Sequence, residues 1–203
     1  KYLLLPSLNA LGQRHPQLRV ELDVSDRMAD MAREGIDIAI RTSTDLPETQ
    51  VARALGQLGR ALYASPDYVA RAGLPQHPDE LAQHRLISNT AAPHLNRWPF
   101  VIEGRPCRRS IDGDWRTNDT GVAAHMLVQG LGIGRLATVA AAPLVQQGLL
   151  VPVLADFVDP QPVPLYAVTA SARQRLPKVR ACIDFWAGWI AGPGAAEPPG
   201  ATA

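Results

Sequence analysis

The sequence predicts an α/β protein of two lobes, and two observations carry this prediction. Residues 18–24 alternate apolar and charged side chains with the period of a half-buried strand. Residues 120–129 follow Asp119, a residue type that caps helices, and we expect a helix there. Strand-like and helix-like segments of these kinds alternate along most of the 203 residues. Such alternation is typical of α/β domains.

The first lobe is predicted to begin with a helix at residues 2–15, where leucines recur at helical spacing. The strand at 18–24 comes next. A second helix begins at Ser25 or Asp26, both of which suit a helix cap. Residues 36–41 read as another strand. Strand, short helix and strand in this order predict a right-handed parallel unit.

The second lobe follows an extended stretch, residues 51–64, in which glycines allow a bend. Helices and strands then alternate around a turn-rich middle part, residues 98–118, that reads as a small antiparallel patch. The remaining predicted elements are helices at 66–69, 78–84, 120–129, 137–148 and 177–192, and strands at 85–89, 131–136, 149–154 and 165–170. The last strand and helix are expected to return to the first lobe.

Composition excludes several classes of protein. Twenty basic and nineteen acidic residues leave a formal charge of +1, which argues against nucleic-acid binding by this segment alone. The sequence lacks an apolar run of the roughly 20 residues that cross a bilayer and a signal-peptide pattern. Cys107 and Cys182 support neither a disulfide framework nor a zinc site, so we expect a soluble protein of the cytoplasm.

The order of several motifs resembles the effector-binding (substrate-binding) domain of LysR-type transcriptional regulators over about residues 3–190. The motifs are IDIAIRT, LYASPDYVARAG, PDELAQHRLI, GLGIGRL and QQGLLVPVL. The resemblance implies an α/β fold of two periplasmic-binding-protein-like subdomains joined by two crossover strands. Subdomain I then comprises residues 1–62, with its first strand truncated, plus 166–191. Subdomain II comprises 63–165, and a disordered tail 192–203.

The resemblance also implies a function. A small-molecule effector would bind in the cleft between the lobes and control DNA binding by an N-terminal winged helix-turn-helix that this sequence lacks. The partner would be a second copy, in a homodimer or homotetramer, with no membrane and no catalysis. A solute-binding protein of a transport system has the same architecture and remains the alternative. An enzyme is the weaker alternative, because no nucleophile and base are convincingly paired.

Candidate effector contacts lie where predicted strands end or a helix begins, since ligands of open α/β sheets bind outside the carboxyl ends of the strands. They are Arg41, Thr42, Ser43, Ser88, Asn89, Asn118, Thr120 and Arg135. An arginine can hold a carboxylate with two hydrogen bonds, which suits a small organic acid as the effector. Asp119 is expected to cap the helix, and residues 41–43 also fit an ordinary polar loop.

Other motifs have simpler explanations than a site. Ser65, before Pro66, fits a helix cap better than a nucleophile. Gly130, Gly132 and Gly134 have the wrong spacing and context for a dinucleotide-binding loop. The five histidines are scattered, which disfavours metal binding, although His94 and His125 can line the cleft. The sequence therefore predicts no cofactor and no metal.

Overall fold

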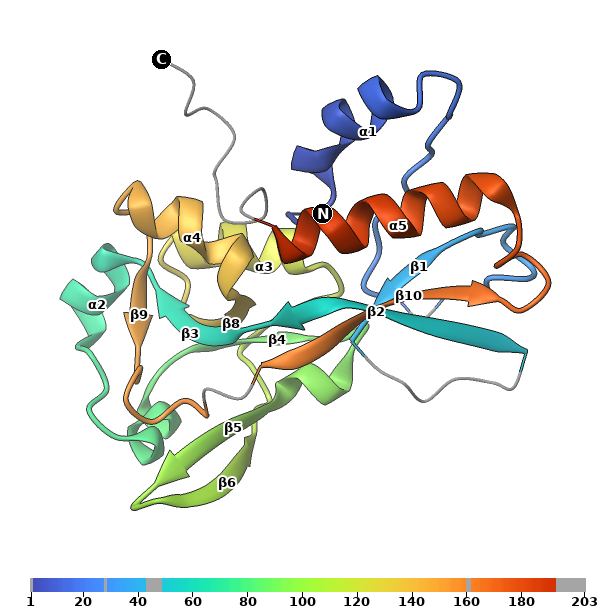
Figure 1. The fold of residues 1–203 in the computed structure, drawn as a ribbon. Coiled ribbons are helices and arrows are strands. Elements are labelled where there is room, and N and C mark those ends of the chain that lie inside the picture. The colour runs from blue at the N-terminus through green and yellow to red at the C-terminus, as the bar shows by residue number, and fades with distance from the viewer. Residues whose placement is uncertain (1, 28, 43–48, 160–161, 193–203) are drawn as a thin grey trace. The chain divides into compact units, whose positions relative to one another are not determined.

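The computed structural model describes residues 2–27, 29–42, 49–159 and 162–192 (Figure 1). Contacts between Cα atoms divide the chain into two compact units. Unit 1 is Lys1–Val24, Ala29–Leu58 and Pro162–Ala203, and unit 2 is Ser25–Met28 and Gly59–Gln161. The chain passes from unit 1 into unit 2 after Leu58 and returns to unit 1 after Gln161. Both positions lie a few residues before the boundaries expected from the sequence. Apart from Gly192, the tail predicted to be disordered lies outside the described residues.

Unit 1 is a three-stranded antiparallel sheet with helices packed against it. Its elements are a short 3-10 helix (Leu5–Ser7), α1 (Leu8–Arg14), β1 (Ala39–Arg41), β2 (Gln50–Leu58), β10 (Val163–Ala170) and α5 (Pro177–Ala191). Strand β10 lies between β1 and β2 and runs antiparallel to both. Val179 and Ile183 of α5 pack with apolar residues of β2 and β10, while Trp186 packs with Leu11 of α1.

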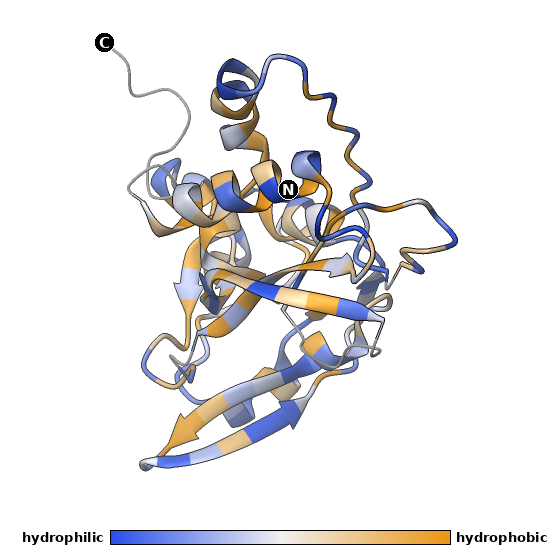
Figure 2. Ribbon diagram, turned by 45° about the vertical axis from the view of Figure 1, so that its right-hand side comes forward, coloured by the Kyte–Doolittle hydropathy of each residue, from blue (hydrophilic) through white to orange (hydrophobic). Residues whose placement is uncertain are grey.

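The parallel strand-helix-strand unit predicted at the start of the chain is wrong. Residues 18–24 form no strand, the expected helix after Ser25 is replaced by bends and turns, and β1 pairs antiparallel with β10. Figure 2 shows the alternation of hydrophobic and hydrophilic residues along this extended segment. Within the described part of the chain no strand lies beside it, so Val24 is 51% exposed. Alternation indicates a strand only where a partner pairs with its backbone.

Unit 2 is built on a five-stranded mixed sheet in the order β7-β4-β8-β3-β9. Its helices are α2 (Pro66–Ala72), α3 (Thr120–Val128) and α4 (Thr138–Gln146), with 3-10 helices η2 (Pro78–Gln83) and η3 (Pro93–Asn96). Its strands are β3 (Arg60–Ala64), β4 (Leu86–Asn89), β5 (Arg97–Ile102), β6 (Arg105–Ser110), β7 (Trp115–Thr117), β8 (Ile133–Ala137) and β9 (Val151–Val153). Strands β7, β4 and β8 are parallel to one another.

Two apolar clusters cover the two faces of this sheet. On one face, Leu127 of α3 and Ala141 of α4 pack with residues such as Tyr63 of β3. On the other face, Trp98 and Phe100 of the β5–β6 hairpin pack on residues of β3, β4 and β8. Figure 1 shows α3 and α4 on one side of the sheet and the β5–β6 hairpin on the other.

Strand β7 corrects a second expectation. The sequence placed residues 114–118 in an antiparallel patch with 98–111, but only β5 and β6 form such a pair. Strand β7 joins the main sheet parallel to β4, with Asn89 opposite Thr117. The carboxyl ends of β4 and β7 therefore lie side by side, next to the start of α3.

Candidate functional site

Asn89, at the carboxyl end of β4, presents a side-chain donor in a fixed direction. Its Oδ1 accepts hydrogen bonds from the backbone N–H groups of Ala91 and Ala92, both at 2.9 Å. Because the amide oxygen is used in this way, the Nδ2 group is directed elsewhere. Asn96 of η3 holds the backbone of Asn89 from the other side. The donor is thus oriented by its surroundings.

Helix α3 begins at the same edge of the sheet. Asp119 caps it, since its Oδ1 accepts from the N–H of Val122 at 2.7 Å, which confirms the predicted cap. Thr117 Oγ1 in turn accepts from the N–H of Asp119 at 3.2 Å. Thr120 is the first residue of the helix. The positive end of a helix dipole favours a negative charge at this place.

A carboxylate of the chain itself lies on these two donors. Asp26 Oδ2 accepts from Nδ2 of Asn89 at 2.7 Å and from Oγ1 of Thr120 at 2.5 Å. Asp26 is half-buried and belongs to unit 2 together with both donors. The pair formed by Asn89 and Thr120 therefore has the geometry that binds a carboxylate oxygen.

Two half-buried arginines lie in the same sheet. Arg135 of β8 pairs with Leu62 of β3, so Arg60, two residues before Leu62, is its diagonal neighbour on the same face. Burial, together with the charges of Arg60 and Arg108, lowers the pKa of Arg135 to about 10. Among the described residues, the buried Nε of Arg135 has no hydrogen-bond partner. Buried cationic groups of this kind favour a nearby anion.

Neighbouring charges shift the pKa values of Arg60 and Arg135 both upward and downward. The pKa of Arg60 is lowered by burial, and the charge of Asp26 partly opposes this shift. Asp159 likewise favours the charged form of Arg135. The pKa of His94 in η3 is lowered by partial desolvation and by the charges of Arg60 and Arg135. The region combines cationic groups with oriented neutral donors.

The structure locates the other predicted contacts as follows. In unit 1, Arg41 ends β1 and donates from Nη2 to the carbonyl oxygen of Ala29 at 2.9 Å, and Thr42 next to it is half-buried. Ser43 lies outside the described residues. In unit 2, Asn118 is exposed, and the buried hydroxyl of Ser88 accepts from the N–H of Gly113 at 3.2 Å. Of the eight predicted residues, Asn89 and Thr120 donate hydrogen bonds to the same carboxylate, that of Asp26.

Sequence reasoning missed Asp26, Asn96 and Arg60 as members of this region. Ser25 or Asp26 was expected to cap a helix, yet Asp26 contacts residues 63 and 94 positions further along the chain. No local pattern contains such a contact. Arg60 meets Arg135 only through the antiparallel pairing of β3 and β8.

The predicted helix cap at Ser65 is confirmed, and the structure also locates the glycines and histidines noted in the sequence. Ser65 caps α2, because its Oγ accepts from the N–H of Tyr68 at 3.1 Å. Gly130 follows α3 with a φ of +70°, a conformation suited to glycine at a helix end. His125 bonds within α3, to the carbonyl oxygen of Gly121. Over the described ranges, no three His, Cys, Asp or Glu side chains gather in a way that could hold a metal ion.

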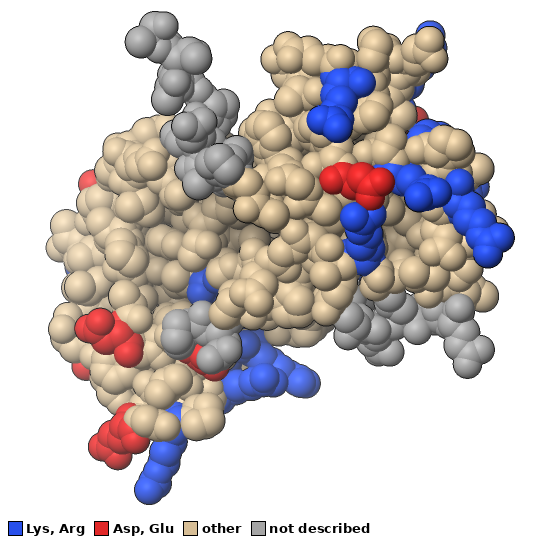
Figure 3. All heavy atoms as spheres, viewed as in Figure 1, with Lys and Arg blue, Asp and Glu red and all other residues tan. Residues whose placement is uncertain are grey.

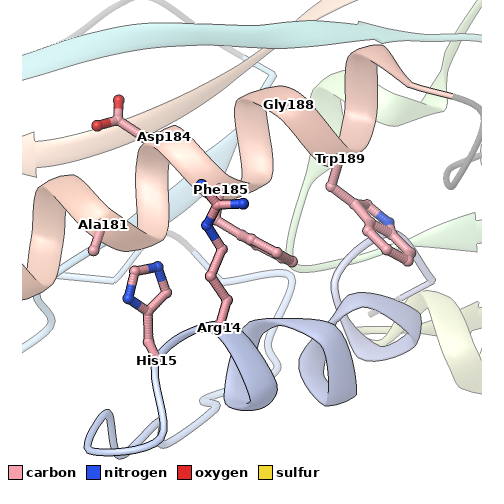
Figure 4. A pocket seen from close by; sticks show the side chains of 7 residues that line it. All are labelled: Arg14, His15, Ala181, Asp184, Phe185, Gly188 and Trp189. Carbon is pink, nitrogen blue, oxygen red and sulfur yellow. The ribbon is translucent and has the colours of Figure 1, made fainter.

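A hollow of about 520 Å³ lies in unit 1 between α1 and α5 (Figure 4). The rings of Phe185 and Trp189 stack there with centroids 6.1 Å apart. Asp184 points away from α1 in Figure 4 and pairs with Arg53. Arg14 and His15 supply the polar groups on the α1 side. Few polar groups converge on this hollow, so the candidate site is assigned to unit 2.

Acidic and basic side chains are interspersed on the face shown in Figure 3, with wide uncharged areas between them. Among the described residues visible on this face of each unit, the basic side chains form no continuous band of the kind that follows a nucleic-acid backbone. Within the described residues, no helix is both long enough and apolar enough to span a membrane.

Comparisons with known proteins agree on one family. The family model described as LysR substrate binding domain matches residues 1–190. An HTH-type transcriptional regulator of Xanthomonas campestris is 32% identical over 187 residues, which cover 90% of this chain and 54% of that protein. The HTH-type transcriptional regulator DmlR of Escherichia coli is 28% identical and is covered to 60%, so the chain spans little more than half of such relatives.

Solved structures confirm the predicted fold class. The regulatory domain of CrgA, a LysR-type transcriptional regulator from Neisseria meningitidis, superposes with a TM-score of 0.83 at 26% identity. The alignment covers 92% of this chain and 91% of that domain. The effector domain of AmpR from Pseudomonas aeruginosa, at 19% identity and a TM-score of 0.77, shows the likeness of fold alone.

Proposed function

Because the chain belongs to the LysR substrate-binding-domain family, we propose that it senses a small-molecule effector for a transcriptional regulator and performs no chemistry on it. DNA binding would be the task of a winged helix-turn-helix elsewhere in the whole protein. The regulator would act in the cytoplasm as a homodimer or homotetramer. The relatives' names, which describe transcriptional regulators, support this proposal.

The effector presents a carboxylate to unit 2. One observation carries this part of the proposal: Asn89 and Thr120 hold a carboxylate oxygen at hydrogen-bond distance, next to the start of α3. Arg135 adds a positive charge with a buried, unpartnered Nε in the described part of the chain. A carboxylate suits both the neutral donors and the neighbouring Arg60, whose charged form Asp26 favours, since charge-assisted hydrogen bonds are about twice as strong as neutral ones.

The other predicted residues have different roles in this proposal. Arg41 and Thr42 of unit 1 remain proposed effector contacts, as does Ser43, which lies outside the described residues. Asn118 lies next to the cap of α3 and contacts the remainder of the effector. Ser88 supports the sheet through Gly113, so its contribution is positional.

Binding regulates by shifting an equilibrium between conformations of the regulator. A ligand can move such an equilibrium only by its difference in affinity for the two states. About 1.4 kcal/mol of difference changes the ratio of the two states tenfold, which a few hydrogen bonds present in one state can supply. No bond of the effector needs to be broken.

A thermal-shift screen tests the proposed effector class. Small carboxylic acids are compared with their uncharged amides, because binding to the folded state raises the melting temperature. We expect shifts with acids alone. Thr120→Val, which removes only the hydroxyl, should weaken a binding acid about fivefold to tenfold, as expected for loss of roughly 1 kcal/mol of hydrogen bonding.

Thr138→Val is the matched control, since Thr138 also begins a helix of unit 2 but lies at α4. It should leave acid binding unchanged. Shifts produced by amides and not by acids would contradict the carboxylate proposal.

A further inference from the structure

We infer that Asp26 is an internal ligand of the effector site, and that the carboxylate of the effector binds by displacing it. This inference rests on the proposed function and adds a regulatory element to it. Asp26 then has two effects: it lowers the apparent affinity of the site, and it selects effectors that carry a negative charge.

The contacts of Asp26 are those of a bound ligand. A single oxygen, Oδ2, accepts from both Asn89 and Thr120. Neither donor depends on Asp26 for its position. Two backbone N–H groups and Asn96 orient Asn89, and Thr120 is fixed as the first residue of a capped helix. An effector carboxylate would meet the same two donors already in place.

The segment that carries Asp26 is suited to leave the site. Residues 25–27 lie in no helix or strand, and their backbone is not part of the sheet. The local bend is closed within the segment, where Ser25 Oγ accepts from the N–H of Arg27 at 3.1 Å. Ser25–Met28 belong to unit 2, while the chain before them, up to Val24, and after them, from Ala29, belongs to unit 1. Displacement therefore breaks no backbone pairing of a helix or strand, and the chain leads from this segment into unit 1 on both sides.

The proposed preference for negatively charged effectors follows from the positive charge of Arg60. Asp26 lies close enough to Arg60 for its charge to favour the charged guanidinium, which is half-buried. Removing Asp26 without a replacement leaves this cation without its counter-charge, which is costly in a partly desolvated place. An anionic effector replaces one negative charge with another. A neutral compound of the same shape does not, so Asp26 disfavours its binding.

The effect on affinity follows from the fraction of molecules in which the donors are free. If Asp26 occupies them in nine molecules of ten, the apparent dissociation constant of an effector is about tenfold higher than the intrinsic one. An acid held by its own chain competes at an effective concentration of order mM. Removal of the Asp26 side chain should therefore strengthen binding.

The experiment is titration calorimetry of the whole chain with acetate, glutarate and benzoate, and with acetamide, glutaramide and benzamide. Asp26→Ala is compared with Asp23→Ala, a change of an exposed aspartate in the preceding part of the same segment. We expect Asp26→Ala to bind at least one acid about tenfold more tightly than the natural chain does. Asp23→Ala should bind as the natural chain does.

A second measurement does not depend on the affinity. Saturation of the natural chain with the same acid should speed hydrogen exchange of the backbone N–H groups at residues 25–27.

Two further variants test the selectivity for charge. Asp26→Asn, which keeps the shape but removes the charge, should bind the three amide compounds more tightly than the natural chain does. Asp26→Glu, which keeps the negative charge, should bind these amides no more tightly than the natural chain does.

The outcomes separate this inference from the proposed function. Acid binding that is equal or weaker in Asp26→Ala, with slow exchange retained at residues 25–27, would overturn the internal-ligand role and leave the effector class intact. If neither the natural chain nor Asp26→Ala binds any of the three acids, the carboxylate proposal itself fails and the inference fails with it. The melting temperature of each variant shows whether it is folded.

Discussion

Asn96 forms a two-way hydrogen-bonded pair with Asn89. The backbone N–H of Asn89 donates to Asn96 Oδ1, and Asn96 Nδ2 donates to the carbonyl oxygen of Asn89, both at 2.8 Å. The side chain of Asn96 thus completes the backbone hydrogen bonding of Asn89 just where β4 ends. Asn96 therefore positions the residue that binds the carboxylate.

Replacement of Asn96 should loosen the donor at Asn89. Asn96→Ala leaves one N–H and one C=O group without these partners, at a cost of about 1–3 kcal/mol if they stay buried. We expect lower stability in urea unfolding and weaker binding of any acid found in the screen. Asn9→Ala, a change of an exposed asparagine in α1, is the control. Full acid binding in folded Asn96→Ala would remove Asn96 from the positioning role.

The predictable part of the site is local in sequence. Asn89 was singled out because it ends a strand, and Thr120 because it opens a helix after a capping aspartate. The parallel pairing of β4 and β7 brings these two places to one edge of the sheet. Rules for strand ends and helix caps therefore identify each residue, whereas the pairing of β4 with β7 that brings them together was not predicted.

The remaining part depends on contacts between distant segments. Asp26 reaches the site across 63 residues, and its neighbourhood was expected to be helical. Residues 18–24 have the pattern of a strand, but pairing is a property of two segments, and one segment alone does not reveal whether its partner is present. The sequence therefore predicts the donors at the site better than the group that occupies them.

Arg135 is expected to lower the stability of the chain and to strengthen the binding of acids. Burial disfavours its charge, so Arg135→Met should stabilise the chain without effector by about 1 kcal/mol, as replacement of poorly compensated buried charges often does. The same change should weaken acid binding, because a positive charge is lost. Urea unfolding and calorimetry measure the two effects. Arg105→Met, at an exposed position of β6, should change neither, and a destabilised Arg135→Met would contradict this view of the site.

Asp37 gives unit 1 a stability that depends on pH. Its carboxylate accepts from Lys178 Nζ at 2.7 Å and from Arg173 Nη1 at 2.6 Å. The hydrogen bond from Lys178, helped by Arg173, lowers the pKa of Asp37 from its usual 3.8, although burial acts in the opposite direction. The folded pKa lies below the unfolded one, so the stabilisation is present above about pH 4 and is lost as the pH falls through the folded pKa.

Asp37→Asn should therefore lower the free energy of unfolding at pH 7. The expected loss is about 1 kcal/mol, because the carboxylate is partly exposed and solvent screens its ion pairs. The difference from the natural chain should shrink as the pH falls below the unfolded pKa of about 4, as measured by urea unfolding at pH 7 and at acidic pH. Asp156→Asn, in an exposed loop, serves as the control at both pH values. A difference that persists unchanged at acidic pH would show that the ion pairs are not its cause.

His94 should report the arrival of an anion. Its pKa is lowered by partial desolvation and then by the positive charges of Arg60 and Arg135. The charge of Asp26 does not contribute to this shift. An effector carboxylate that lies closer to those arginines than Asp26 does would offset their repulsion, so its binding should raise the pKa of His94. By linkage, the chain takes up protons on binding, and affinity should rise as the pH falls through the range in which His94 titrates.

Nuclear magnetic resonance of the imidazole Cε1–H, with and without saturating acid, measures this shift. His84 is the internal control, because its lowered pKa comes from burial, opposed by Glu80, and its ring contacts Tyr68. The His84 titration should stay in place while that of His94 moves upward. An acid that binds with an affinity independent of pH, and that leaves both titrations unchanged, would bind away from Arg60 and Arg135. In that case the charge that selects the effector would have to come from another part of the chain.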